Sequence, residues 1–192
     1  GNLLVGAPAA WAISRLRFRG RSMVRGLYIV LMLLPFQVTM VPSYLVLRQF
    51  GLLDTPWAII LPGIFSTFPV FIMERGFDTI PREVLESASI DGANQWQRFW
   101  RIGIPLGIPG LISALTLGFL DAWNAIEQPM TFLESPQYWP LSLFFTDPAN
   151  LDTKQLGLAM AASLWMLLPS ILVFRFGQTY LEAGLTKGAV KG

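Results

Sequence analysis

The chain has 192 residues, of which 53% are hydrophobic and only 14% are charged, a balance too apolar for an ordinary soluble domain. Its formal net charge of +2 gives no support to a nucleic-acid partner. Cysteine and histidine are both absent, which excludes disulfides and thiolate metal sites and removes the commonest general base.

The N-terminal part predicts a partial helix at residues 3–14, which is apolar but too short to cross a bilayer alone. A cluster of basic residues follows at once, formed by Arg15, Arg17, Arg19, Arg21 and Arg25. Such a run can be a solvated face or a nucleic-acid patch. Next to apolar segments it favours the anchoring of a cytoplasmic loop.

Four stretches predict complete membrane-spanning helices, at about residues 26–47, 57–73, 102–120 and 157–175. The first two contain prolines, so we expect kinks or local unwinding there. The third is rich in glycine, which lets helices approach closely in lipid. The predicted fold is therefore an all-α, polytopic transmembrane helical bundle in a single domain, residues 1–192.

The basic residues alternate between the predicted loops. Five precede the first complete span, four lie in or beside the loop at residues 76–101, and three lie at the C-terminus. The two other loops hold one each, and the longer of them, residues 121–156, is acidic. This pattern predicts that the 76–101 loop and the C-terminus are cytoplasmic and that the 121–156 loop is external.

The 76–101 loop carries the longest amphipathic, charge-bearing segment of the chain. Pro81 suits the first turn of a helix, and Gly92 offers a break before a second helical piece. That piece has Trp96, Phe99 and Trp100 on one face. The pattern predicts a bent helical hairpin at a membrane surface.

Several kinds of chemistry have no sequence support. The chain contains no phosphate-binding G-x-x-x-x-G-K-[ST] motif, no Ser/His/Asp set and no Cys nucleophile. We therefore expect neither an enzyme nor a bound metal or cofactor. The small residues of the hairpin would let a partner groove close over it, but an amphipathic helix that merely caps the bundle fits the same pattern.

The hairpin also resembles a known motif. Glu86-Ser87-Ala88, Asp91-Gly92-Ala93 and Ile102-Gly103-Ile104-Pro105-Leu106 closely resemble the EAA loop of ABC-importer permeases, with Ser87 and Ile104 as mild departures. The I-D-G-A version, the RLRFRG run and the C-terminal tail are similar to the carbohydrate-uptake, maltose-type branch. The resemblance covers the whole chain and implies a type I ABC importer permease (MetI-like) fold. Because subunits of that family have a longer N-terminal part, it also implies an N-terminally truncated chain.

The resemblance implies docking roles for particular residues. In that family, two permease subunits form the pathway, and each of two cytoplasmic ATPase subunits, which bind ATP and Mg, grips one such loop. By resemblance, the docking residues here are Glu86, Ser87, Ala88, Asp91, Gly92 and Ala93, with Ile102, Ile104 and Pro105 at the junction to the next span. The tail residues Gly184, Leu185, Thr186, Lys187 and Gly188 are similar to a tail that reaches the ATPase interface, although a disordered end fits them as well.

Two further sets of residues are candidates for external or pathway contacts. Gln137, Tyr138 and Trp139 either contact the extracytoplasmic solute-binding protein or anchor the loop at the interface. Trp123 and Asn124 either contact sugar by stacking and hydrogen bonding, or act as an interfacial aromatic and a helix-to-helix bond.

The function implied is that of a permease subunit in a bacterial or archaeal cytoplasmic membrane, moving a sugar or oligosaccharide by alternating access driven by separate ATPases. The expected partners are two ATPase copies, a second permease that is a homologous but different chain, a solute-binding protein and lipid, with no nucleic acid. One alternative is a permease for glycerol phosphate or another polar solute. The other is an ATPase-independent secondary transporter, which the absence of ionisable residues inside the predicted spans argues against.

Overall fold

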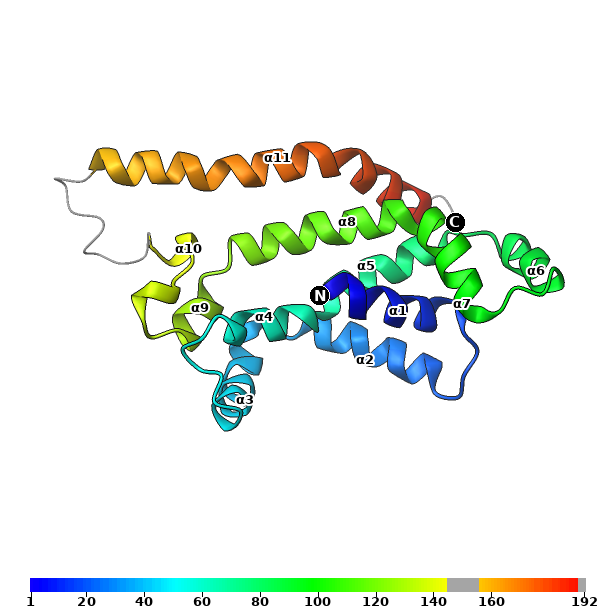
Figure 1. Cartoon of the computed structure of the whole chain (residues 1–192), viewed down its shortest axis with the longest axis horizontal. Coiled ribbons are helices and arrows are strands. Elements are labelled where there is room, and N and C mark those ends of the chain that lie inside the picture. Colours follow the sequence, from blue (N-terminus) through cyan, green and yellow to red (C-terminus); the bar gives the residue numbers. More distant parts are fainter. Residues whose placement is uncertain (145–155, 190–192) are drawn as a thin grey trace. The chain divides into compact units, whose positions relative to one another are not determined.

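The computed structural model describes residues 1–144 and 156–189, and all the regular structure in this part of the chain is helical. The elements are α1 (Asn2–Arg15), α2 (Arg21–Leu33), α3 (Phe36–Gln49), α4 (Trp57–Ile64), α5 (Thr67–Asp78), α6 (Arg82–Ile90), α7 (Gln95–Arg98), η1 (Phe99–Gly103), α8 (Ile104–Trp123), α9 (Glu127–Phe132), η2 (Pro136–Tyr138), α10 (Leu141–Phe144) and α11 (Leu156–Ala189). The predicted all-α fold is confirmed (Figure 1).

Within the described residues, two helical stretches are long and apolar enough to cross a membrane, Trp57–Asp78 and Gln95–Trp123. A third span is present if α2 and α3 together count as one broken span. The break between those two helices falls at Leu34 and Pro35, where the sequence predicts a kink. The helix α11 covers the predicted last span and continues to Ala189.

The chain forms two compact units, which are described separately. Unit 1 contains Gly1–Leu33, Ile64–Gly118 and the described part of Phe176–Gly192. Unit 2 contains Leu34–Gly63 and the described part of Phe119–Arg175.

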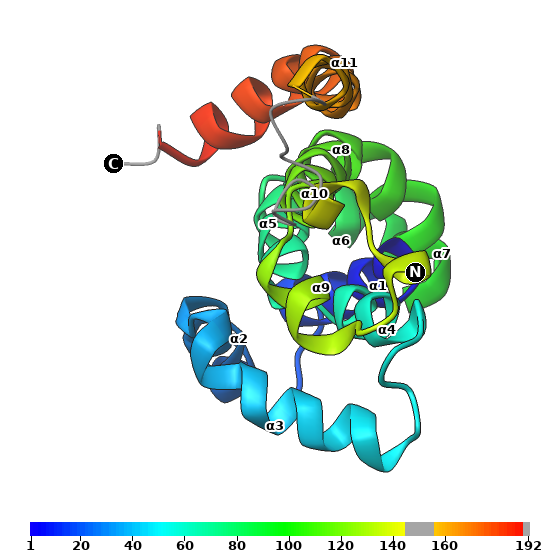
Figure 2. The same ribbon diagram turned by 90° about the vertical axis from the view of Figure 1, so that its left-hand side faces the viewer.

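Unit 1 is built around the packing of α1, α5 and α8, which lie together in both ribbon views (Figures 1 and 2). The buried residues of α5 include Val70, Met73 and Phe77, which recur at helical spacing and form one apolar stripe. Glycines allow α5 and α8 to come into backbone contact: a Cβ on Gly76 would lie 2.7 Å from the Cα of Gly110. Small residues therefore provide the close helix approach that the glycine-rich span predicts.

Unit 2 has a smaller core, formed by Leu47, Ala58, Phe132 and Leu133. The aromatic rings of Phe36 and Phe132 meet edge to face, with their centroids 5.8 Å apart. Around this core the chain runs through the short elements α9, η2 and α10. The described part of the 121–156 loop is thus largely structured, and residues 145–155 lie outside the description.

Candidate docking site

The hairpin begins with α6, which follows Pro81 and buries none of its residues. Its C-terminal end is closed by two backbone hydrogen bonds: the N–H of Ala93 donates to the Ala88 carbonyl at 2.9 Å, and that of Gly92 donates to the Ser89 carbonyl at 3.2 Å. This pair is a Schellman motif, which needs a left-handed residue after the helix. Gly92 has φ +82, so the glycine sits where the motif requires it.

The second arm starts two residues later with a reciprocal cap. The backbone N–H of Gln97 donates to Asn94 Oδ1 at 2.9 Å, and the Asn94 N–H donates to Gln97 Oε1 at 2.8 Å. Such a capping box satisfies two backbone donors at the start of a helix. From Gln95 the chain stays helical to Trp123, through the π-helical turn η1. The local sequence therefore stops one helix and starts the next within a few residues, and the predicted hairpin is present.

A hollow of about 340 Å³ lies at the bend of the hairpin. We call it the docking hollow; its lining residues are Ala88, Asp91, Gly92, Ala93, Gln97, Arg101 and Ile102. It thus brings together five of the nine residues predicted to dock a partner. Glu86 instead faces a separate, larger cleft on α6, whereas Ile104 and Pro105 lie at the start of α8.

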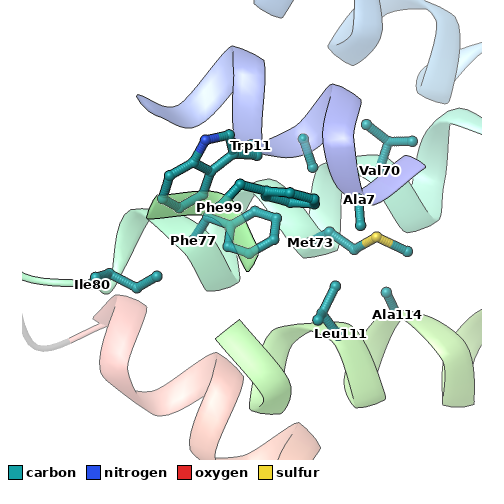
Figure 3. Packing of buried hydrophobic residues seen from close by; sticks show 10 residues of the cluster. Ala7, Trp11, Val70, Met73, Phe77, Ile80, Phe99, Leu111 and Ala114 are labelled. Atoms are coloured by element: carbon teal, nitrogen blue, oxygen red, sulfur yellow. The ribbon is translucent and has the colours of Figure 1, made fainter. Parts of the chain in front are cut away.

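The opposite side of the hairpin is anchored in the core of unit 1. Phe99, the first residue of η1, is only 2% exposed, whereas Trp96 and Trp100 beside it are more than half exposed. The Phe99 ring lies 5.8 Å from Trp11 of α1 and 6.3 Å from Phe77 of α5, between ring centroids (Figure 3). The hairpin is therefore tied to two other helices through one aromatic side chain.

The end of α5, just before the hairpin, is held by a group of polar contacts that we call the α5 clasp. Arg15 donates from Nε to the Phe77 carbonyl at 3.0 Å and from its terminal nitrogen to the Ile80 carbonyl at 2.5 Å. These carbonyls lie at a helix C-terminus, where a cation is favourable.

The clasp continues to the neighbouring helix. Arg25 of α2 pairs with Glu74 and with Asp78, the latter at 2.8 Å, and Ser14 donates to the other Asp78 oxygen at 2.6 Å. The Glu74 side chain is only 3% exposed, so Arg25 provides the ion pair that a buried carboxylate needs. Three helices thus meet at the point where the chain enters the hairpin.

Comparison with known proteins identifies the family. Residues 2–187 match the family described as "Binding-protein-dependent transport system inner membrane component". The chain belongs to this family. It is a permease of the ABC-importer class, and its place in an inner-membrane family agrees with the apolar helices.

Two relatives and one solved structure show which known proteins the permease is similar to. It is 33% identical to the inner membrane ABC transporter permease protein YcjP of Escherichia coli, over 99% of this chain and 69% of the relative. It is 29% identical to the arabinooligosaccharides transport system permease protein AraQ of Halalkalibacterium halodurans, over 100% of this chain and 68% of the relative. The permease thus spans about two thirds of the length of these relatives.

The solved structure is that of a bacterial ABC transporter involved in the import of the acidic polysaccharide alginate. Its TM-score is 0.77 at 27% identity, and the match covers 93% of this chain and 68% of that one. The predicted type I importer permease fold is confirmed.

The two predicted pathway residues of the permease both make internal hydrogen bonds. The Trp123 indole N–H donates to the Met166 carbonyl at 2.9 Å, and its ring stacks on Phe119. Asn124 donates to the Leu120 carbonyl, one helical turn earlier, at 2.7 Å. The Asn124 bond lies within one helical turn and the Trp123 bond holds its indole to α11, so neither contact tests the predicted roles, and sugar contact stays a prediction.

The three predicted binding-protein contacts differ in exposure. Gln137 and Tyr138 are exposed on η2, whereas Trp139 packs against the core of unit 2. The first two side chains are therefore more accessible to a partner protein than Trp139, which is partly buried. The predicted tail residues 184–188 are helical in α11, but their side chains lie outside the described residues.

Sequence reasoning did not identify the α5 clasp. Arg25 stands 49 and 53 residues before the two acids that it pairs with, so no local pattern joins them. The sequence does place a basic residue beside one apolar segment and two acidic residues beside another, and this opposite charge was the available signal. Within the described residues, no group of three or more His, Cys, Asp or Glu side chains is arranged to hold a metal ion.

Proposed function

We propose that this permease is the transmembrane subunit of an importer for a sugar or oligosaccharide, powered by ATP hydrolysed on separate subunits. The carbohydrate class is supported by the names of two similar proteins, an arabinooligosaccharides permease and an alginate importer. The chain's own part is conformational: it binds partners and moves between inward-open and outward-open states. ATP and Mg belong to the ATPase subunits.

The observation that carries the docking proposal is the two-sided construction of the hairpin. Its outer side carries the docking hollow. The small residues there let a partner helix enter the hollow or let a partner groove close over the hairpin. Its inner side is fixed by Phe99 in the core of unit 1. A surface helix that only capped the bundle would need no such hollow.

The same construction suggests how force reaches the spans. When two ATPase subunits close on ATP, each pulls on the hairpin that it holds. Phe99 then moves with the hairpin and displaces Trp11 and Phe77, the ring neighbours on α1 and α5. The α5 clasp keeps α1, α2 and α5 together at that point, so they move as one body.

The proposed assembly has further members. A second, homologous permease completes the pathway, and an extracytoplasmic solute-binding protein delivers the solute. In this arrangement the hairpin and the C-terminus are cytoplasmic, as the distribution of basic residues predicts. Exposed Gln137 and Tyr138 are the candidate contacts with the binding protein.

Affinity purification of the tagged full-length protein from mild detergent tests the docking role. A Gly92→Trp variant should fill the docking hollow and release the ATPase while keeping the second permease. Gly51→Trp is a matched control, because Gly51 also has positive φ and open space around it but lies in unit 2. Retention of the ATPase by Gly92→Trp, or equal loss in both variants, would overturn the docking proposal.

A further inference from the structure

A cleft of about 1330 Å³ lies in unit 1, on the face of α6 away from the docking hollow. We call it the arginine cleft. It lies between α6, the start of the second hairpin arm, the end of α5 and the segment that joins α1 to α2. Six arginines line it: Arg15, Arg17, Arg21, Arg25, Arg82 and Arg98.

The positive charge of the cleft is only partly compensated. Three acids also line it, Asp78, Glu83 and Glu86, and of these Asp78 is already engaged by Arg25 and Ser14. Arg15 and Arg21 donate to backbone carbonyls, which carry no net charge. Among the six arginines of this described cleft, Arg25 alone forms an ion pair with a carboxylate.

Two further observations indicate that an anion would bind favourably in the cleft. The Nε of Arg98 is buried and has no hydrogen-bond acceptor among the described residues. The pKa of Arg15 is lowered, first by burial and then by the positive charges of Arg82 and Arg21, against the opposite effect of Asp78. Like charges are thus crowded at the cleft, and a bound anion would relieve this repulsion.

We propose that the arginine cleft binds a phosphate group, carried either by the headgroup of an anionic lipid or by a soluble phosphate compound. Arginine is suited to this ligand because its planar guanidinium donates two parallel hydrogen bonds to phosphate oxygens. The volume exceeds that of ordinary small-molecule sites and so accommodates a phosphate together with its glycerol or similar group.

The location also fits a phosphate at the membrane surface. The cleft adjoins the ends of α1, α2 and α5, helices that belong to the predicted spans. Basic clusters next to the ends of transmembrane helices attract anionic headgroups. Since Arg82 belongs to α6 and Arg17 to the α1–α2 segment, a bound phosphate bridges the hairpin to that segment. This site is separate from the docking hollow, and its existence does not rest on ATPase docking.

The test uses the complex purified through a tag on this subunit and placed in nanodiscs. The cleft variant is Arg17→Gln/Arg82→Gln. The matched control is Arg19→Gln/Arg48→Gln, which removes the same charge at exposed residues that line neither the cleft nor the docking hollow. ATPase retention is recorded for both, so that loss of phosphate binding is distinguished from loss of docking.

The lipid arm counts phosphatidylglycerol bound to the complex by native mass spectrometry. The soluble arm measures the unfolding midpoint in phosphatidylcholine nanodiscs with inorganic phosphate against sodium chloride of equal ionic strength. A fall of about tenfold in bound phosphatidylglycerol, in the cleft variant only, supports a lipid headgroup. A phosphate-induced rise in midpoint that only the cleft variant loses supports a soluble ligand. If the two variants behave alike in both arms, the proposal is overturned.

Discussion

The two units of this permease are stabilised in different ways. In unit 1, α1, α5 and α8 share a continuous core, the α5 clasp joins α2 to α1 and α5, and the helical hairpin enters the core through Phe99. In unit 2, a core of four buried residues is supplemented by hydrogen bonds that the Asp54 carboxylate accepts from the backbone N–H groups of Glu134 and Ser135. The difference indicates that rigidity is concentrated where the proposed docking force enters the bundle.

The largest effect is expected from breaking the α5 clasp. Glu74→Ala leaves Arg25 without its buried partner and should lower the free energy of unfolding by about 3–5 kcal/mol, measured by denaturant titration in detergent. The double variant Arg25→Met/Glu74→Leu removes both charges and should recover most of that loss. If the double variant is as unstable as Glu74→Ala, the pair does not act as a buried ion pair.

A somewhat smaller effect is expected from removing the hairpin anchor. Phe99→Ala leaves a cavity between Trp11 and Phe77 and should cost about 3 kcal/mol. Trp100→Ala, on a neighbouring but exposed ring, is the matched control and should cost much less. The same titration measures both, and equal costs would show that Phe99 is not the anchor.

The bend of the hairpin provides a third and milder test. Gly92→Val must hold a branched residue at φ +82 and should destabilise the bend by about 1–2 kcal/mol. Gly92→Asn should be tolerated better, because asparagine adopts this conformation more readily. Hydrogen exchange of the Gln95–Arg98 amides reports the loosening, and identical exchange in the two variants would argue against a Schellman bend.

The smallest effect is expected in unit 2 and depends on pH. Hydrogen bonds from the Ser135 hydroxyl and from the Ser135 and Glu134 backbone lower the pKa of Asp54. The folded-state pKa is below the unfolded value of about 3.9, so the stabilisation is present above that value and is lost as pH falls through the folded pKa. Asp54→Asn should therefore slightly reduce the free energy of unfolding at neutral pH and remove part of its decrease at acidic pH. An unchanged acid profile would contradict this assignment.

The sequence predicted the features that depend on local chemistry. The helical class, the stop at Gly92, the aromatic face around Phe99 and the close approach of glycine-rich helices all follow from residue type and spacing. The α5 clasp could not be predicted, because a sequence does not say which of several apolar helices are neighbours. For the same reason, the sequence placed Trp139 in a loop but could not show that it packs against the core of unit 2.

The docking role of the hairpin is tested most directly by labelling a single introduced cysteine, since these 192 residues contain none. Ala93→Cys places a thiol at the docking hollow, and Gln49→Cys places one at an exposed position of unit 2 as a control. Maleimide labelling is compared with the ATPase subunits bound and after their removal. The bound ATPase should protect Ala93→Cys from labelling and leave the labelling of Gln49→Cys unchanged. Equal labelling of Ala93→Cys in both states would contradict the docking role.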